Sequence, residues 1–185
     1  MPWTSAIVAS GIPIAVGMAE AQKRLNEVDG QNRIVICQFG DGAMEEGVFT
    51  ESINYASLKE LPILFACEDN GLAIHTCKEV RTPNTSYESR ISTYGIETSL
   101  YSYQNPQNLM QGINLAITQV RKNKPHFLIV ECFRWMEHVG VNFDWDLGYR
   151  KKEELDFWKK FDLETNPELW SCTKEIVEEI NIKVK

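Results

Sequence analysis

The 185-residue sequence lacks the features that define several large protein classes. It has only three histidines, and its five cysteines form no CxxC pair, which argues against a zinc site or a disulfide framework. It has no apolar run of 18 residues, and its N-terminus lacks the basic region and apolar core of a signal peptide. Neither a membrane span nor a secretory signal is therefore expected.

Basic residues are also in deficit. The chain has 19 Lys and Arg against 26 Asp and Glu, a formal net charge of −7, and its basic residues form only short clusters. This balance argues against a nucleic-acid partner or an anionic membrane surface. Cys37, Cys67 and Cys132 lie inside apolar runs, which predicts reduced, buried thiols and a cytoplasmic protein.

Apolar strand-like runs alternate with amphipathic helical segments along the chain. This alternation predicts an α/β fold in which helices cover both faces of a parallel sheet. We expect residues 1–140 to form the α/β domain and residues 141–185 a helical extension of it, with helices near 151–161 and 173–180. The expected helices are 12–27, 46–59 and one that starts at Pro106 with Asn105 as its cap; the expected strands are 33–39, 62–67, the region around 98–101, and 127–133.

Two other parts of the chain are interpreted from their polarity. Residues 71–90 contain few apolar side chains and are expected to form a long functional loop. His126, which follows Lys124-Pro125 ahead of the last strand, is expected to be exposed to solvent.

Polar side chains end two neighbouring apolar runs. Asp41 follows the first in Gly40-Asp41-Gly42, and Asn70 follows the second in Glu68-Asp69-Asn70-Gly71. At the carboxyl ends of neighbouring parallel strands, a carboxylate and a carboxamide converge on one point, which suits a small hard cation. The glycines beside Asp41 allow a phosphate to approach bare backbone N–H groups. The pattern predicts a diphosphate held through Mg²⁺.

The segment from Gly40 to Thr76, GDGAMEEGVFTESINYASLKELPILFACEDNGLAIHT, resembles the alpha subunit of the E1 component of 2-oxo acid dehydrogenases. SAIVASGIPIAVGMA (5–19) also resembles this family, as do, more loosely, the strand that ends at Arg134 and residues 148–150. The resemblance extends over roughly residues 4–165. It implies the thiamine diphosphate-binding fold, with thiamine diphosphate and Mg²⁺ as cofactors.

The resemblance also implies roles for particular residues. The metal ligands would be Asp41, Asn70 and the backbone carbonyl of Leu72. Asp69 replaces the first residue of the family's usual Asn-Asn pair; it is either a turn residue or an extra charge near the cation. The implied cofactor-binding residues are Ala6, Val8, Gly40, Asp41, Gly42, Ala43, Asn70, Leu72 and Ile74, although Ala6 and Val8 are equally consistent with small apolar residues leading into a helix.

The catalytic candidates are His138 and His75. Relatives have two histidines separated by one residue where this chain has His138 and Gly140. An imidazole here can donate a hydrogen bond to an anionic intermediate or shuttle a proton. Both histidines are also consistent with ordinary loop positions. Arg81 and Arg90 are candidates for binding a substrate carboxylate, but solvated arginines are the favoured interpretation.

The resemblance implies oxidative decarboxylation of a small 2-oxo acid with acyl transfer to a lipoyl-bearing E2 partner. The carboxylate that activates the cofactor comes from a beta-type subunit in this family, so we expect an α2β2 heterotetramer in which this chain alone is inactive. Alpha subunits carry a long portion before the first matching segment, so either the chain is a fragment or another chain supplies that portion. The alternatives are a transketolase-like module that transfers ketol units and a truncated, non-catalytic partner subunit.

Overall fold

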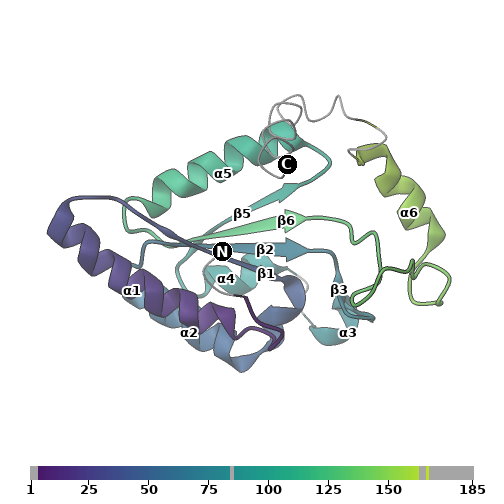
Figure 1. Cartoon of the computed structure of the whole chain (residues 1–185), viewed down its shortest axis with the longest axis horizontal. Coiled ribbons are helices and arrows are strands. Elements are labelled where there is room, and N and C mark those ends of the chain that lie inside the picture. Colours follow the sequence, from purple (N-terminus) through teal and green to yellow (C-terminus); the bar gives the residue numbers. More distant parts are fainter. Residues whose placement is uncertain (1–3, 84–85, 163–165, 167–185) are drawn as a thin grey trace, which may run out of the picture.

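The structure, a computed structural model, describes residues 4–83, 86–162 and 166. Its centre is a four-stranded, entirely parallel sheet. In Figure 1 the arrowheads of all four strands point to the same end of the molecule. In spatial order the strands are β1 (Val35–Gly40), β2 (Ile63–Asp69), β6 (His126–Glu131) and β5 (Glu97–Ser102).

Helices cover both faces of this sheet, as predicted (Figure 1). Successive side chains of a strand point to opposite faces, so Phe65 of β2 packs in one core cluster and Leu64 in the other. The first cluster is built with α1 (Gly11–Asp29), α2 (Gly47–Leu58) and α4 (Tyr87–Ser92), and the second with α5 (Pro106–Val120).

The helices and strands expected up to residue 133 are confirmed, with ends that shift by up to two residues. The predicted cap of α5 is present, since the Asn105 side chain accepts a hydrogen bond of 3.1 Å from the backbone N–H of Asn108. The expectation of one long loop over 71–90 is wrong, because Tyr87 and Ile91 anchor a helix in the core. This region contains β3 (Leu72–Ala73), β4 (Thr76–Cys77), α3 (Lys78–Arg81) and α4.

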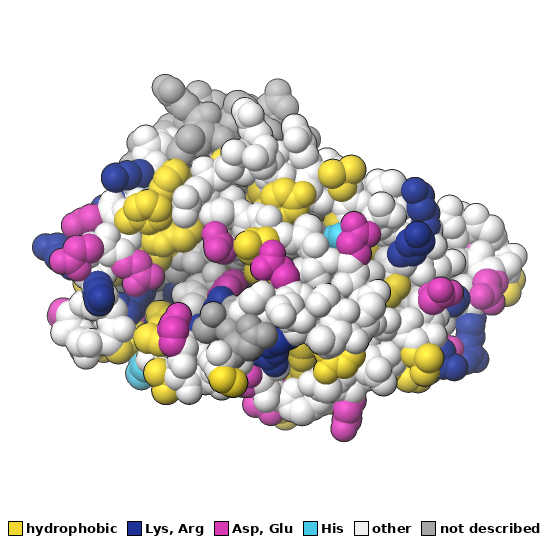
Figure 2. Space-filling view, turned by 180° about the vertical axis from the view of Figure 1, so that it is seen from behind, with side chains coloured by type: hydrophobic (Ala, Val, Ile, Leu, Met, Phe, Trp, Pro, Cys, Tyr) yellow, Lys and Arg dark blue, Asp and Glu magenta, His cyan; other side chains and the backbone are white. Residues whose placement is uncertain are grey.

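Beyond β6 the chain forms α6 (Lys152–Trp158) and a 3-10 turn, η2 (Lys159–Phe161), which confirms the helical prediction for 151–161. The helix predicted near 173–180 lies outside the described residues. Within the described part of the chain, no helix is long and apolar enough to span a bilayer. Figure 2 shows one face of the molecule, on which Lys and Arg are interspersed with Asp and Glu rather than gathered into one basic patch.

Four cysteines fall within the described residues, and all are free thiols. Cys37 and Cys67 are buried, as predicted, whereas Cys132 is half-buried. Burial raises the pKa of Cys37 to about 12, so its sulfur stays protonated near neutral pH. These thiols therefore behave as small apolar side chains.

His126 is buried, so the expectation of an exposed histidine is wrong. It opens β6, a central strand, and is paired in register with Leu64 on one side and Glu97 on the other. Its Nε2 lies 2.8 Å from the Ser99 hydroxyl, while its Nδ1 has no hydrogen-bond partner in the described structure. Burial lowers the pKa of His126 below its ordinary value of 6.5.

This lowered pKa predicts that His126 makes the folded protein less stable at acidic pH. The unfolded chain takes up a proton at this position below about pH 6.5 while the folded chain does not, so the free energy of unfolding should fall as the pH drops through that value. His126→Gln, which cannot titrate, should flatten this part of the profile. Urea unfolding of both proteins between about pH 5 and pH 8 would measure it. Equal slopes for the two proteins would contradict the assignment.

Candidate metal and diphosphate site

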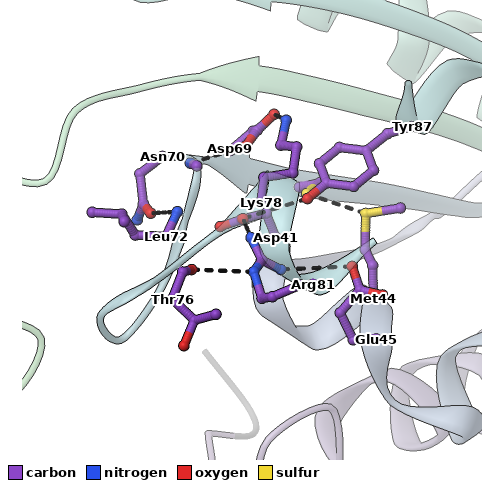
Figure 3. A network of polar contacts seen from close by, with 12 residues as sticks. Asp41, Met44, Glu45, Asp69, Asn70, Leu72, Thr76, Lys78, Arg81 and Tyr87 are labelled. Carbon is purple, nitrogen blue, oxygen red and sulfur yellow. Dashed lines mark hydrogen bonds and ion pairs between the residues drawn. The ribbon is translucent and has the colours of Figure 1, made fainter. Parts of the chain in front are cut away.

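Asp41 lies where β1 passes into the 3-10 turn η1 (Asp41–Glu45), and it is only 1% exposed. Its Oδ2 accepts hydrogen bonds from the Arg81 guanidinium and, at 3.4 Å, from the Tyr87 hydroxyl (Figure 3). Its Oδ1 is buried without a hydrogen-bond partner in the described structure. Burial raises the pKa of Asp41, and the hydrogen bond and positive charge of Arg81 oppose that rise.

Asn70 follows β2 and shapes the turn that leads into β3. Its Oδ1 accepts a hydrogen bond of 2.9 Å from the N–H of Leu72, and Asp69 Oδ1 accepts one of 3.1 Å from the N–H of Gly71. Gly71 has φ +74°, a left-handed conformation that favours glycine. Asp69 is thus a turn residue, and its other oxygen is paired with the ammonium of Lys78.

The β3–β4 hairpin lies against η1, the turn that begins at Asp41. A Cβ added to Gly42 would come within 2.9 Å of the Cβ of Ala73 on β3. At the tip of the hairpin, Ile74 adopts φ +55°, which is unusual for a β-branched side chain. Its carbonyl accepts a 2.8 Å hydrogen bond from Arg134. The fold therefore holds this hairpin, which contains Leu72 and Ile74, beside the loop that carries Asp41.

The contact at Gly42 predicts that Gly42→Ala destabilises the protein by about 1–2 kcal/mol, because the new methyl group forces η1 and β3 apart. Gly40→Ala is the matched control. It lies two residues away, has an extended backbone, and a Cβ there would meet nothing within 4 Å. We expect it to change stability by less than about 0.5 kcal/mol. Urea denaturation would compare the two; equal losses would show that the close contact is not the cause.

The two candidate histidines are both exposed. The His75 ring lies 4.6 Å from the ring of Tyr149, so the hairpin tip and the segment after β6 are in contact. His138 lies on that same segment, and its catalytic role stays a prediction. Ala6 and Val8 are exposed in the turn before α1; Ala9, next to them, is buried in the same core cluster as Ala43 of η1.

Three basic side chains pair with Asp41 and the carboxylates around it, and their positions differ from the expectations drawn from the sequence. Solvation was the favoured interpretation for Arg81, but its side chain is only 8% exposed and is paired with Asp41. Arg90 pairs instead with Glu45 at 3.2 Å. Lys78 was not singled out, although the spacing of Lys78 and Arg81 by three residues was a signal that one short helix presents both.

Asp41, Asn70 and Leu72 offer oxygen donors of the types that Mg²⁺ prefers. Among the described residues, no group of three or more His, Cys, Asp or Glu side chains could hold a metal ion. A metal ion here would depend on one carboxylate, the Asn70 amide, the Leu72 carbonyl and oxygens of a bound ligand, which is a donor set typical of Mg²⁺. The Oδ1 atom of Asp41, which is buried and has no hydrogen-bond partner in the described structure, would be the charged donor of such a set.

A cavity of about 300 Å³ lies on the other side of β2. It is lined by Glu68, which alternates with Asp69 along the strand, and mainly by aromatic side chains of the segments after β5 and β6 and of the α6 region. It contains none of the residues predicted to bind the cofactor. Its lining residues are Glu68, Tyr103, Cys132, Phe133, Trp135, Trp158, Phe161 and Asp162.

Comparison with known proteins gives a consistent result. The family model described as "Dehydrogenase E1 component" matches residues 2–166. The chain is 34% identical over 163 residues to the mitochondrial 2-oxoisovalerate dehydrogenase subunit alpha of Mus musculus, covering 85% of this chain and 35% of that protein. It is 29% identical over 157 residues to the pyruvate dehydrogenase E1 component subunit alpha of Rickettsia bellii, covering 84% and 46%. The chain spans less than half of each relative.

Two solved structures share the fold. A transketolase from Campylobacter jejuni aligns with a TM-score of 0.57 at 24% identity, covering 69% of this chain and 20% of that one. A putative thiamin diphosphate-dependent enzyme from Mycobacterium smegmatis aligns with a TM-score of 0.53 at 22% identity, covering 69% and 22%. At these identities the likeness concerns the fold.

Proposed function

The chain belongs to the dehydrogenase E1 component family, and from this premise we propose that it acts as an alpha-type component of a thiamine diphosphate-dependent 2-oxo acid dehydrogenase. The observation that carries the proposal is the buried carboxylate of Asp41, whose Oδ1 has no hydrogen-bond partner in the described structure and lies where the chain leaves β1. A buried, unsatisfied carboxylate oxygen calls for a ligand, and a cation on this oxygen would provide one.

In the proposed complex, Asp41, Asn70 and the Leu72 carbonyl would hold Mg²⁺, and the backbone N–H groups of Gly42 and Ala43 would bind the diphosphate. Thiamine diphosphate, when bound, supplies the electron sink needed for decarboxylation of a 2-oxo acid. Ile74, at the tip of the β3–β4 hairpin, would lie beside the cofactor. His75 on that hairpin and His138 on the facing segment are the groups proposed to hold or move protons.

The assembly is also a proposal. The relatives are named as alpha subunits of 2-oxoisovalerate and pyruvate dehydrogenases, which supports a small 2-oxo acid as the substrate. We propose that a beta-type E1 subunit completes the site in an α2β2 heterotetramer, and that a lipoyl-bearing partner accepts the acyl group.

Calorimetry with thiamine diphosphate and Mg²⁺ tests the proposal, on the chain alone and with a co-expressed beta-type subunit. We expect Mg²⁺-dependent binding in the complex, followed by decarboxylation of 2-oxoisovalerate or pyruvate. Cofactor binding with ketol transfer in place of decarboxylation would favour the transketolase-like alternative. No cofactor binding in either form would favour a non-catalytic subunit.

A further inference from the structure

Arg81 forms an ion pair with Asp41, the carboxylate that the proposed function assigns to the metal. Arg81 donates through Nη2 to Asp41 Oδ2, and the two side chains are 8% and 1% exposed. The guanidinium is fixed on two further sides: its Nε donates to the Thr76 carbonyl at 3.3 Å, and its Nη1 lies 3.6 Å from Glu45 Oε1 (Figure 3). Arg81 is thus a built part of the site.

The neighbouring carboxylates already have basic partners of their own. Asp69 is paired with Lys78, and Glu45 is paired with Arg90 at 3.2 Å. The acidic groups around Asp41 are therefore neutralised by the protein itself. A divalent cation that approaches Asp41 meets the positive charge of Arg81 on the same carboxylate, in a buried setting where repulsion between like charges is poorly screened.

We propose that Arg81 is an internal counter-cation of Asp41, which neutralises the carboxylate in the metal-free protein and competes with Mg²⁺ for it. This inference rests on the proposed function in taking Asp41 as the metal ligand. In the metal-free protein Arg81 balances the charge of Asp41, and a metal ion bound at Oδ1 would place a second positive charge next to the guanidinium at Oδ2. Glu45 Oε1, 3.6 Å from Arg81 Nη1, offers the guanidinium a further negative charge. Because of the charge of Arg81, the protein binds the metal more weakly than the same oxygen ligands would without it.

Titration with Mn²⁺, which accepts the same oxygen ligands and loses its free-ion EPR signal on binding, tests the competition in the absence of thiamine diphosphate. We expect Arg81→Gln to bind Mn²⁺ about tenfold more tightly than the wild type, because the competing charge is gone. Arg81→Lys keeps the charge and should stay within about threefold of the wild type. Arg90→Gln removes a neighbouring arginine that pairs with Glu45, not Asp41, and serves as the matched control.

Thermal unfolding provides a second readout. Without metal, Arg81→Gln should unfold at a lower temperature than the wild type, and saturating Mn²⁺ should raise its midpoint by more than that of the wild type. If Arg81→Gln bound Mn²⁺ no more tightly than the wild type, or if Arg90→Gln gained as much Mn²⁺ affinity as Arg81→Gln, the proposal that Arg81 competes with the metal would be wrong.

The two proposals fail in different ways. If thiamine diphosphate and Mg²⁺ bind the wild type through Asp41 but Arg81→Gln gains no Mn²⁺ affinity, the counter-cation is wrong and the proposed function stands. If Arg81→Gln gains Mn²⁺ affinity while no form of the protein binds thiamine diphosphate, the counter-cation stands and the proposed function is wrong.

Discussion

Replacing Asp41 with asparagine is expected to abolish Mg²⁺-dependent binding of thiamine diphosphate. The substitution keeps the size of the side chain but removes the negative charge, so the remaining protein donors are the neutral oxygens of Asn70 and Leu72. Mg²⁺ gives up its hydration water reluctantly, and neutral oxygens alone do not compensate for that loss. Calorimetry on the complex with a beta-type subunit would measure the effect, and cofactor binding retained in Asp41→Asn would show that another residue anchors the metal.

The same substitution should also lower the free energy of unfolding, by about 3 kcal/mol, because it leaves Arg81 buried without its main charge partner. This cost comes from the buried ion pair, in which Arg81 is 8% and Asp41 1% exposed. The double variant Asp41→Asn with Arg81→Gln removes both charges and should recover most of the stability while cofactor binding remains absent. Urea denaturation of the two single variants and the double variant forms the cycle that isolates the pair.

A non-additive result is essential to this interpretation. If Asp41→Asn and Arg81→Gln each destabilise the protein and their effects simply add, the two charges do not stabilise each other in the fold. Binding and stability therefore test different properties of one carboxylate: its role as a metal ligand and its role as the partner of a buried cation.

The centre of the sheet was predictable from sequence because β2 and β6 are buried on both faces. The run Ile63–Cys67 has no polar alternation and is short, which is typical of a parallel strand covered by helices on both sides. The sequence also predicted that polar side chains follow the carboxyl ends of two neighbouring strands. Asp41 and Asn70 follow β1 and β2, which are paired in register up to Gly40 and Glu68, so the fold brings them to the same edge.

The partners of Asp41 could not be predicted in the same way. Arg81 reaches it across 40 residues of sequence, and Tyr87 across 46. Local patterns do not specify such contacts, because they depend on the path of the segment after β2. That path is set by the side-chain turns at Asp69 and Asn70 and by burial of Tyr87, so a segment poor in apolar residues was mistaken for one loop. His126 was misassigned for a related reason: its burial comes from neighbouring strands.

Replacing Asp144 with alanine should release the segment after β6, which carries His138. Asp144 is completely buried and accepts hydrogen bonds from Arg134 at 2.6 Å, Arg150 at 2.7 Å and the Tyr149 hydroxyl. Without the carboxylate, two arginines whose side chains are 13% and 2% exposed lose their shared counter-charge. We expect amide hydrogen exchange over residues 133–150 to accelerate at least about tenfold, with a smaller effect on the sheet.

Acid should reproduce this release in the wild type. Burial alone would raise the pKa of Asp144, but the hydrogen bonds from Tyr149, Arg150 and Arg134 outweigh it and hold the pKa below the ordinary value of 3.8. The stabilisation is therefore complete above about pH 4 and is lost as the pH falls through the lowered pKa. Asp146→Asn, an exposed position on the same segment, is the matched control and should leave exchange unchanged. If Asp144→Ala and Asp146→Asn exchanged alike, contacts other than this carboxylate would be holding the segment against the hairpin that carries His75.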